Sequence, residues 1–196
     1  MEGSRYLGGF VGTTSSLEEW LTPKIRQWTS AVETLAKYAG KYPQTAFAGL
    51  TKSLQQEWQY VQRVTPGVGA FFQPVEDAIV EKFLPALFGL TASAVRDFRP
   101  LLTLPAREGG LGIPNPTESA DLSFTSSSNI VEELADALRN NDTSFDVGDF
   151  LQDVRRRGQN WKGEPLSWYS RLRAELLQHM DPLSARRLAR SRLTGA

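Results

Sequence analysis

The amino-acid sequence predicts a mainly α fold, an irregular helical bundle with one short N-terminal strand or extended segment. Apolar residues recur every three or four positions through most of the chain, which is the spacing of one face of an α-helix. Prolines and glycines interrupt this pattern, so the helices are expected to be joined by short turns. Helices connected in this way pack against one another.

The N-terminal segment differs from the rest of the chain. Residues 5–12, RYLGGFVG, are aromatic and β-branched with bounding glycines, and they predict a strand or extended segment with a tight turn. The helix that follows is expected to start at Ser16, because Ser16 and Glu19 have the spacing of a capping box. Its apolar face covers 17–39, and Pro23 is expected to kink or restart it.

Three more helices are predicted in the first hundred residues. Pro43 opens one that the turn residues 65–67 end, a second covers 71–88, and a short one leads into Pro100. The next stretch, 107–116, contains three glycines and two prolines and is expected to be irregular.

Beyond this stretch, Asn115 is the expected cap of a helix whose first residue is Pro116. The serine-rich residues 125–129 predict a loop or a helix break. The remaining helices are expected at 129–138, 145–157, 166–180 and 182–193.

The composition excludes several classes of protein and site. No apolar run approaches the eighteen or so residues of a membrane span, and no signal-peptide pattern is present, so no membrane partner is expected. Cysteine is absent, which excludes disulfides, thiolate metal sites and cysteine nucleophiles. A cysteine-free chain fits an intracellular, reducing location, in the cytoplasm or the nucleus.

Charge is unevenly distributed although the formal net charge is zero. Residues 108–153 contain ten acidic side chains and one basic one, whereas residues 155–196 contain ten basic and three acidic ones. Such polarity is typical of a chain with one surface suited to an anionic partner. The alternative is that the two segments neutralise each other within the fold.

No catalytic residue and no cofactor are expected in this chain. The single histidine, His179, has neither the partner that a catalytic imidazole needs nor the further ligands of a zinc site. The adjacent carboxylates 18/19, 76/77 and 132/133 are explained by helix N-termini, where negative charge is favourable. Asp146, Asp149 and Asp153 share a helix face, which either binds a cation weakly or is simply solvated.

Basic and aromatic residues alternate after residue 154. Arginines contact phosphates and aromatic rings stack on bases, so this interleaving suits single strands or structured RNA. The alternative, which helical spacing favours, is that the aromatic residues are core and the arginines a solvated face. The basic candidates in this part of the chain are Arg155, Arg156, Arg157, Arg186, Arg187 and Arg190.

Two motifs carry a family resemblance. Residues 5–12 resemble the K/R-Y-L-G segment that follows the palm in reverse transcriptases of non-LTR-type retrotransposons. Residues 104–116, LPAREGGLGIPNP, resemble the LP-x-R-x-GGLGI-x-(N/D)-P signature found further along the same polyproteins. Residues 189–196 resemble the lead-in to a GA-x-x-WL motif, so the resemblance covers nearly the whole chain.

The resemblance implies a C-terminal thumb and linker region without the palm. It implies a thumb-like helical region at 1–100, the GGLGI loop with acidic helices at 101–157 and a basic helical tail at 158–196. Residues 5–11 would lie near the primer-holding edge of the palm, and 16–64 would flank the template–primer duplex. The parent RNA-directed DNA polymerase uses magnesium, but its paired aspartates have no counterpart here, so the chain is expected to be inactive alone.

Three functional hypotheses remain open at this point. In the first, the fragment contacts RNA or an RNA–DNA duplex, or the missing polymerase palm, as an accessory part. Its phosphate contacts would be Arg5, Lys24, Arg26, Lys52, Arg63 and the basic tail. In the second, the chain is a helical protein-interaction module. In the third, it is a non-functional retroelement relic, and residues 1–100 would leave an apolar patch exposed.

Overall fold

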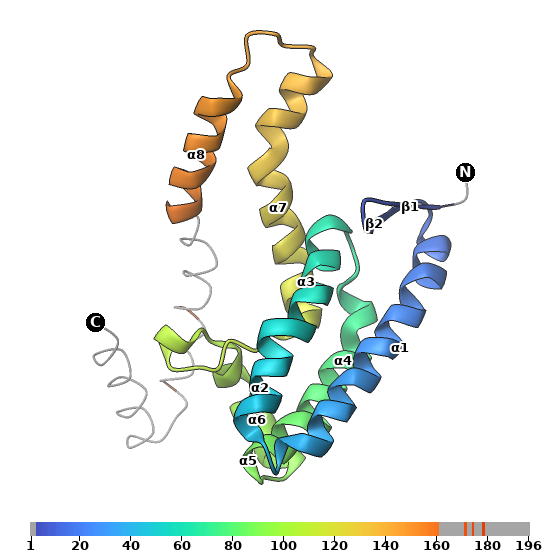
Figure 1. Ribbon diagram of the computed structural model, residues 1–196, viewed down its shortest axis with the longest axis vertical. Coiled ribbons are helices and arrows are strands. Elements are labelled where there is room, and N and C mark those ends of the chain that lie inside the picture. Colours follow the sequence, from blue (N-terminus) through green and yellow to red (C-terminus); the bar gives the residue numbers. More distant parts are fainter. Residues whose placement is uncertain (1–2, 161–170, 172–173, 175–177, 179–196) are drawn as a thin grey trace. The chain divides into compact units, whose positions relative to one another are not determined.

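The computed structural model describes residues 3–160 together with 171, 174 and 178 (Figure 1). It confirms a mainly α fold with a short β element at the N-terminus. Of the helix predicted at 166–180 only residues 171, 174 and 178 are described, and each is helical, whereas His179 and the helix predicted at 182–193 lie outside the described residues. The elements in chain order are β1 (Ser4–Tyr6), β2 (Gly9–Val11), α1 (Thr14–Ala39), α2 (Pro43–Gly49), η1 (Leu50–Leu54), α3 (Gln55–Val64), η2 (Gly69–Phe72), α4 (Gln73–Ala78), η3 (Ile79–Phe83), α5 (Leu84–Phe88), α6 (Ala92–Thr103), η4 (Ala106–Glu108), α7 (Pro116–Arg139) and α8 (Val147–Asn160).

The chain forms two compact units. The first contains residues 1–99 and 113–125, and the second contains residues 100–112 and 126–196. Helix α7 therefore begins in the first unit and ends in the second. The functional division predicted at residues 100 and 157 stays a prediction.

Helix α1 begins earlier than the sequence predicts. Thr13 is the N-cap, and its Oγ1 accepts a hydrogen bond from the Ser16 backbone N–H at 3.4 Å. Ser16 therefore lies in the first turn and is not the cap, because the run 13–16 offers four hydroxyl side chains and the helix extends to the first of them. Pro23 neither ends nor restarts α1, since it lies inside the continuous helix, and Leu21 and Ile25 on either side of it are both buried.

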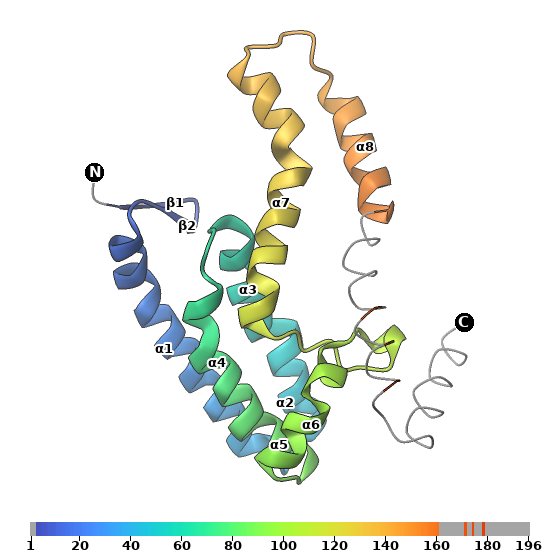
Figure 2. The ribbon, with the colours of Figure 1, turned by 180° about the vertical axis from the view of Figure 1, so that it is seen from behind.

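The core of the first unit is built around α1. Figures 1 and 2 show α4 alongside α1, and the two helices are in contact. Trp28 stacks on Phe72 with ring centroids 5.8 Å apart, and it meets Trp58 edge-on at 6.4 Å. The indole N–H of Trp28 donates to Glu57 Oε2 at 3.0 Å, so the one polar atom of this buried ring is satisfied.

The helix predicted over 71–88 is a continuous helical stretch that changes type along its length. It begins as the 3₁₀ turn η2, continues as α4, widens into the π-helical η3 and ends as α5. Pro85 follows directly after the first residue of α5, where a missing N–H is tolerated because of the preceding π turn. Gly89 ends the stretch in the left-handed conformation, with φ of 66°.

Two predicted interruptions are absent from the structure. Pro100 lies inside α6, whose last turn is stabilised by the Thr103 hydroxyl donating to the Pro100 carbonyl at 2.7 Å. The serine-rich residues 125–129 are part of α7, not a break, because serine and threonine each weaken a helix by only about 0.5 kcal/mol. The predicted start of α7 is confirmed, since Asn115 Oδ1 accepts from the Thr117 N–H at 3.0 Å.

Candidate nucleic-acid interface

The N-terminal segment is a β-hairpin. Tyr6 pairs with Gly9 in antiparallel register, so Leu7 and Gly8 form a two-residue turn. Both turn residues have positive φ, 46° and 85°, as a type I′ turn requires. Glycine adopts this conformation readily, whereas leucine does so at a cost of about 1 kcal/mol. The predicted N-terminal strand with its tight turn is thus a hairpin of two short paired strands.

Two helices hold the hairpin in place. The Tyr60 hydroxyl on α3 donates a hydrogen bond to the Leu7 carbonyl at the tip of the turn. On β2, Phe10 stacks on Trp20 of α1, with ring centroids 5.4 Å apart and an interplanar angle of 28°. One contact thus holds the strained turn, and the other holds strand β2.

Two of the predicted phosphate contacts are neighbours of the residues in this stack. Arg5 lies directly opposite Phe10 in the register, so both side chains project from one face of the hairpin. Lys24 lies one helical turn after Trp20, and its Nζ is 5.2 Å from the indole centroid. Arg5 and Lys24 therefore flank one Phe10–Trp20 pair, and the indole ring favours the Lys24 ammonium over its face.

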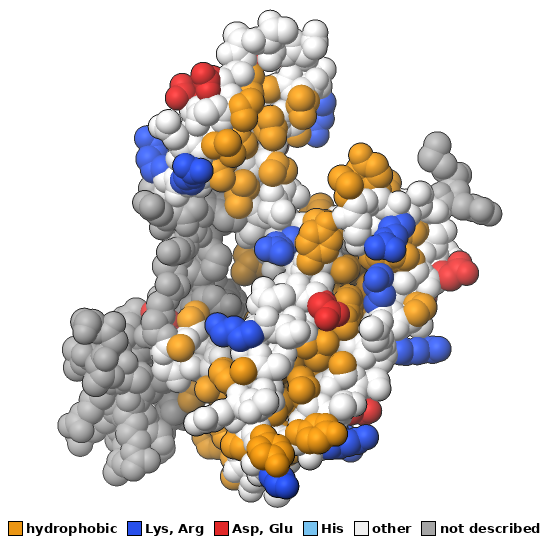
Figure 3. All heavy atoms as spheres, in the orientation of Figure 1, with side chains coloured by type: hydrophobic (Ala, Val, Ile, Leu, Met, Phe, Trp, Pro, Cys, Tyr) orange, Lys and Arg blue, Asp and Glu red, His pale blue; other side chains and the backbone are white. Residues whose placement is uncertain are grey.

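A third predicted cation lies on α3, the helix that contacts the hairpin turn through Tyr60. Arg63 is three residues after Tyr60 on α3, so the two side chains share a helix face. The neighbouring Val64 lies close to Gly9, where an added Cβ would be 3.0 Å from the Val64 Cγ2 atom. Arg5 lies on the hairpin, and Lys24 and Arg63 lie on the two helices that contact it; we call these three residues the hairpin cations. Figure 3 shows Lys and Arg side chains among hydrophobic ones in this part of the surface.

Aromatic and apolar side chains are exposed on the same hairpin. Tyr6 and Val11 are each 68% exposed and Leu7 is 79% exposed, while Tyr60 beside them is 40% exposed. Tyr6, Trp20 and Tyr60 were not among the site residues predicted from the sequence. The alternating pattern of residues 4–11 indicates the strands themselves. Their packing partners, Trp20 on α1 and Tyr60 on α3, are distant in sequence.

The other two predicted cations of the first unit lie elsewhere. Arg26 is two residues after Lys24, which places it on a different side of α1, where it lines a groove of about 590 Å³ with Phe71 and Thr22. Lys52 lies on η1, eight residues before Tyr60, or roughly 12 Å along a helix axis. The structure does not bring these two residues to the hairpin.

The basic residues of the second unit are only partly described. Arg155 and Arg156 are exposed on α8, and Arg156 forms an ion pair with Asp153 one turn earlier. The Arg157 side chain and the whole of Arg186, Arg187 and Arg190 lie outside the described part of the chain. Their role as phosphate contacts stays a prediction.

A buried ion pair lies in the first unit, where the sequence predicted only a helix-end carboxylate. Arg99 makes a two-pronged contact with Glu76, from Nε to Oε1 at 2.6 Å and from Nη2 to Oε2 at 2.7 Å. Its Nη1 donates to the Ile113 carbonyl at 2.7 Å, so the arginine also holds the last residue of the GGLGI motif. Glu76 is therefore more than a favourable charge near a helix start. No spacing in the sequence indicates this pair.

Burial affects the ionisation of Glu76. Desolvation raises the pKa of the Glu76 carboxyl above 4.5, and the hydrogen bond and charge of Arg99 oppose that rise. Glu118 and Asp77 add smaller contributions that raise the pKa. The carboxylate thus depends on Arg99 for its charged form.

The GGLGI loop of the second unit is a backbone turn, as the glycine pattern predicts. Gly109 and Gly112 have positive φ, and a Cβ on Gly110 would come within 2.1 Å of the Leu104 carbonyl oxygen. The Gly112 N–H donates to the same carbonyl at 2.8 Å. These glycines permit the chain to fold back on the end of α6.

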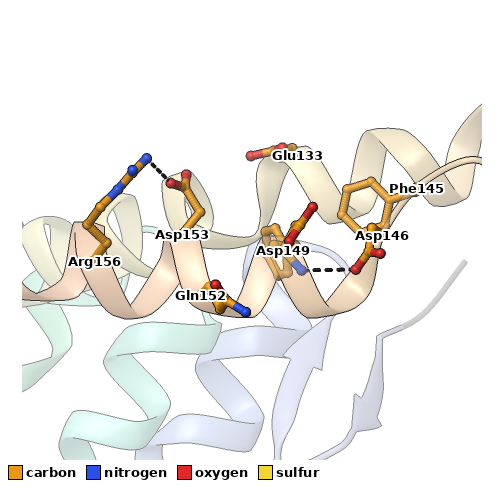
Figure 4. Close-up of a pocket in the computed structure, with 8 residues that line it drawn as sticks. Glu133, Phe145, Asp146, Asp149, Gln152, Asp153 and Arg156 are labelled. Carbon is orange, nitrogen blue, oxygen red and sulfur yellow. Dashed lines mark hydrogen bonds and ion pairs between the residues drawn. The ribbon is translucent and has the colours of Figure 1, made fainter.

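The acidic residues of α8 line a hollow of about 690 Å³ with Glu133 of α7 (Figure 4). Asp146 accepts from the Asp149 N–H at 2.9 Å and so caps α8, while Asp153 pairs with Arg156. The three aspartates line one hollow, in agreement with the predicted shared face. Among the residues that the structure describes, no group of three or more potential ligands is arranged to hold a metal ion.

Within the described segments, no single helix combines the length and hydropathy needed to cross a membrane. Gly69–Phe88 and Ala92–Thr103, bent by 99°, meet that criterion only as a pair.

Comparison with known proteins leaves the chain without a family assignment. No family model, no curated protein and no solved structure matches this sequence.

Proposed function

We propose that this chain is a non-catalytic part of a retrotransposon RNA-directed DNA polymerase, and that the β-hairpin contacts the backbone of an RNA–DNA duplex. The observation that carries this proposal is the grouping of Arg5, Lys24 and Arg63 around the hairpin. The resemblance of residues 5–12 and 104–116 to the reverse-transcriptase segments supplies the substrate class. In this proposal, a separate palm binds the magnesium ions and carries out catalysis.

The geometry of the hairpin cations suits phosphate contacts. Arg5 and Arg63 are exposed, and the half-buried Lys24 has its ammonium over the indole of Trp20. Cationic side chains held by packed aromatic residues lose less conformational freedom on binding than free ones. Phosphate contacts fix position and carry no base preference, so the interface would bind many sequences.

The exposed apolar side chains of the hairpin, which we call its apolar tip, favour a second contact, with a protein. Tyr6, Leu7 and Val11 are large side chains exposed together on a short hairpin. Such a patch is typical of a protein contact. The palm that the resemblance implies is the proposed partner for this tip, with the cations directed to the duplex. The relic hypothesis predicts an exposed apolar surface as well, but it predicts no specific binding.

Binding to a labelled RNA–DNA primer–template, measured by fluorescence anisotropy with the full chain, tests the proposal. We expect affinity to fall steeply with salt, because each phosphate contact releases counterions. The variant Arg5→Gln/Lys24→Gln/Arg63→Gln should weaken binding at least tenfold at low salt. It should also reduce the slope of log K against log salt by about 0.9 per lost contact.

A matched control separates the interface from bulk charge. Lys37, Lys41 and Lys82 are exposed cations of the same unit that lie away from the hairpin. The variant Lys37→Gln/Lys41→Gln/Lys82→Gln removes the same charge and should retain affinity within about twofold, since distant exposed charges are largely screened. Equal losses in the two variants, or binding that does not respond to salt, would contradict the proposal.

A further inference from the structure

A groove of about 590 Å³ in the first unit has one polar wall and one apolar wall. The polar wall is a stripe of α1, because Arg26, Ser30 and Glu33 follow one another at intervals of four and three residues. The apolar wall contains Phe71 of η2 and Pro74 of α4. Figures 1 and 2 show α4 alongside α1, and the two helices are in contact. Helix packing within a single unit therefore forms this groove.

Arg26 supplies a free positive charge to the groove. Its side chain is exposed, and no described residue forms a hydrogen bond or an ion pair with its guanidinium. In contrast, each of four other described arginines pairs with a carboxylate, namely Arg96, Arg99, Arg139 and Arg156. The planar guanidinium of Arg26 is therefore available for two parallel hydrogen bonds to an anion such as a phosphate.

The groove also contains a carboxylate and an aromatic ring. Glu33 is exposed and lies seven residues after Arg26, or roughly 10 Å along the helix axis, a separation that a nucleotide spans. Phe71 is half-buried and lines the groove from η2. Aromatic rings stack on nucleic-acid bases whatever the sequence. A cation, a ring and a carboxylate thus correspond to the phosphate, the base face and the base edge of one nucleotide.

We infer that this groove binds one unpaired nucleotide of the template strand, with its phosphate at Arg26, its base on Phe71 and its base edge at Glu33. The class of ligand rests on the proposed function, and the groove adds a single-stranded site to the duplex contacts of the hairpin. Its volume is within the range of about 300–1,000 Å³ that is typical of small-ligand pockets. A groove of this size accepts a nucleotide but not a duplex.

The carboxylate of Glu33 makes this site selective for the base. A carboxylate accepts hydrogen bonds and donates none. Guanine presents two neighbouring donors on its Watson–Crick edge, the N1–H and the N2 amino group, whereas uracil presents one N–H between two carbonyl oxygens. Glu33 therefore favours guanine and repels the carbonyls of uracil. The hairpin cations contact phosphates alone and have no such preference.

Binding of two fluorescein-labelled pentaribonucleotides, UUGUU and UUUUU, to the full chain tests the inference by fluorescence anisotropy. UUGUU should bind at least about fivefold more tightly, the lower end of the discrimination that one two-pronged base contact provides. Glu33→Gln should abolish this preference, because an amide offers one donor and one acceptor. Arg26→Gln should weaken both oligonucleotides, and Phe71→Leu should weaken both at least about fivefold through loss of stacking.

Three control variants separate the groove from bulk charge and from misfolding. Lys82→Gln and Glu19→Gln each remove an exposed charge of the same unit outside the groove and should leave both affinities within about twofold. Phe71→Tyr keeps the ring and should retain binding, so that loss in Phe71→Leu reports stacking. Equal affinity of the wild type for the two oligonucleotides, no detectable binding of UUGUU, or a guanine preference that survives Glu33→Gln would overturn the inference.

A blunt RNA–DNA duplex distinguishes failure of this inference from failure of the proposed function. Arg26→Gln, Phe71→Leu and Glu33→Gln should bind such a duplex within about twofold of wild type, because it has no unpaired base. Substitution of the hairpin cations should weaken duplex binding and leave the preference for UUGUU intact. Loss of the guanine preference alone therefore overturns the groove assignment, whereas duplex binding that does not depend on the hairpin cations contradicts the proposed function.

Discussion

Helix α7 passes from a packed environment into an exposed one. In the first unit, Pro116 and Ala120 are buried, and Gln62 donates to the Pro116 carbonyl at 2.7 Å. In the second unit, Val131 and Leu138 of the same helix are exposed. The first part is fixed by residues far away in the sequence, and the second by local interactions such as the Asp136–Arg139 ion pair one turn apart. We therefore expect substitutions in the packed part to reduce stability, and substitutions in the exposed part to alter binding.

The largest expected effect comes from the buried ion pair of the first unit. Arg99→Ala leaves the Glu76 carboxylate buried without its partner and should reduce the free energy of unfolding by about 3–5 kcal/mol. Urea unfolding followed by circular dichroism measures this change.

The exposed pair Arg96–Glu81 provides the control for this prediction. Arg96→Ala removes a surface ion pair and should change stability by at most about 1 kcal/mol. Adding Glu76→Leu to Arg99→Ala should restore much of the loss, because no buried charge then remains. If Arg96→Ala proved as damaging as Arg99→Ala, burial would not explain the first result.

A second large effect should be confined to the GGLGI loop. Gly110→Ala places a Cβ within 2.1 Å of a backbone oxygen, which a side-chain rotation cannot relieve. We expect a loss of about 1–3 kcal/mol. Hydrogen exchange of the Gly112 N–H, which donates to Leu104, should become faster. Gly67→Ala tests a positive φ without any crowding and should cost less.

The sequence predicted local structure well where one element determines it. The Asn115 cap of α7, the helix start at Pro43 and the buried stripe of α1 follow from spacing and backbone chemistry alone. Pro23 and Pro100 misled the prediction because tertiary packing keeps both helices continuous through the missing hydrogen bond. The serines near 125–129 misled it because their individual helix penalties are small.

The candidate site was less predictable than the fold. Arg5, Lys24 and Arg63 were identified as cations, but spacing along the chain cannot show that they share one hairpin while Arg26 and Lys52 do not. That grouping depends on the Phe10–Trp20 stack and on the bond from Tyr60 to Leu7. The Glu76–Arg99 pair escaped prediction for the same reason, since 23 residues and a helix end separate its members.

A smaller effect is expected at the hairpin turn. Leu7→Asn gives the Asn-Gly pair that type I′ turns prefer and removes a strained leucine, so it should stabilise the protein by about 0.5–1 kcal/mol. Thermal unfolding measures the gain. Leu90→Asn changes an exposed leucine of the same unit whose φ is not positive, and should give no comparable gain. Equal shifts in the two variants would show that polarity, and not backbone strain, is responsible.

The smallest expected effect is a pH dependence that belongs to the packed region alone. Because burial raises the pKa of Glu76 above 4.5, the folded protein holds this proton more tightly than the unfolded chain. The resulting stabilisation is fully present below pH 4.5 and is lost as pH rises through the raised pKa. Glu76→Gln has no proton to lose at this position. The unfolding free energy of wild type relative to that of the variant should therefore fall as pH rises just above 4.5. For Glu81→Gln, at an exposed carboxyl of the same unit, the unfolding free energy should change with pH in this range as it does for wild type. Parallel curves for Glu76→Gln as well would mean that Arg99 compensates the burial of Glu76 completely.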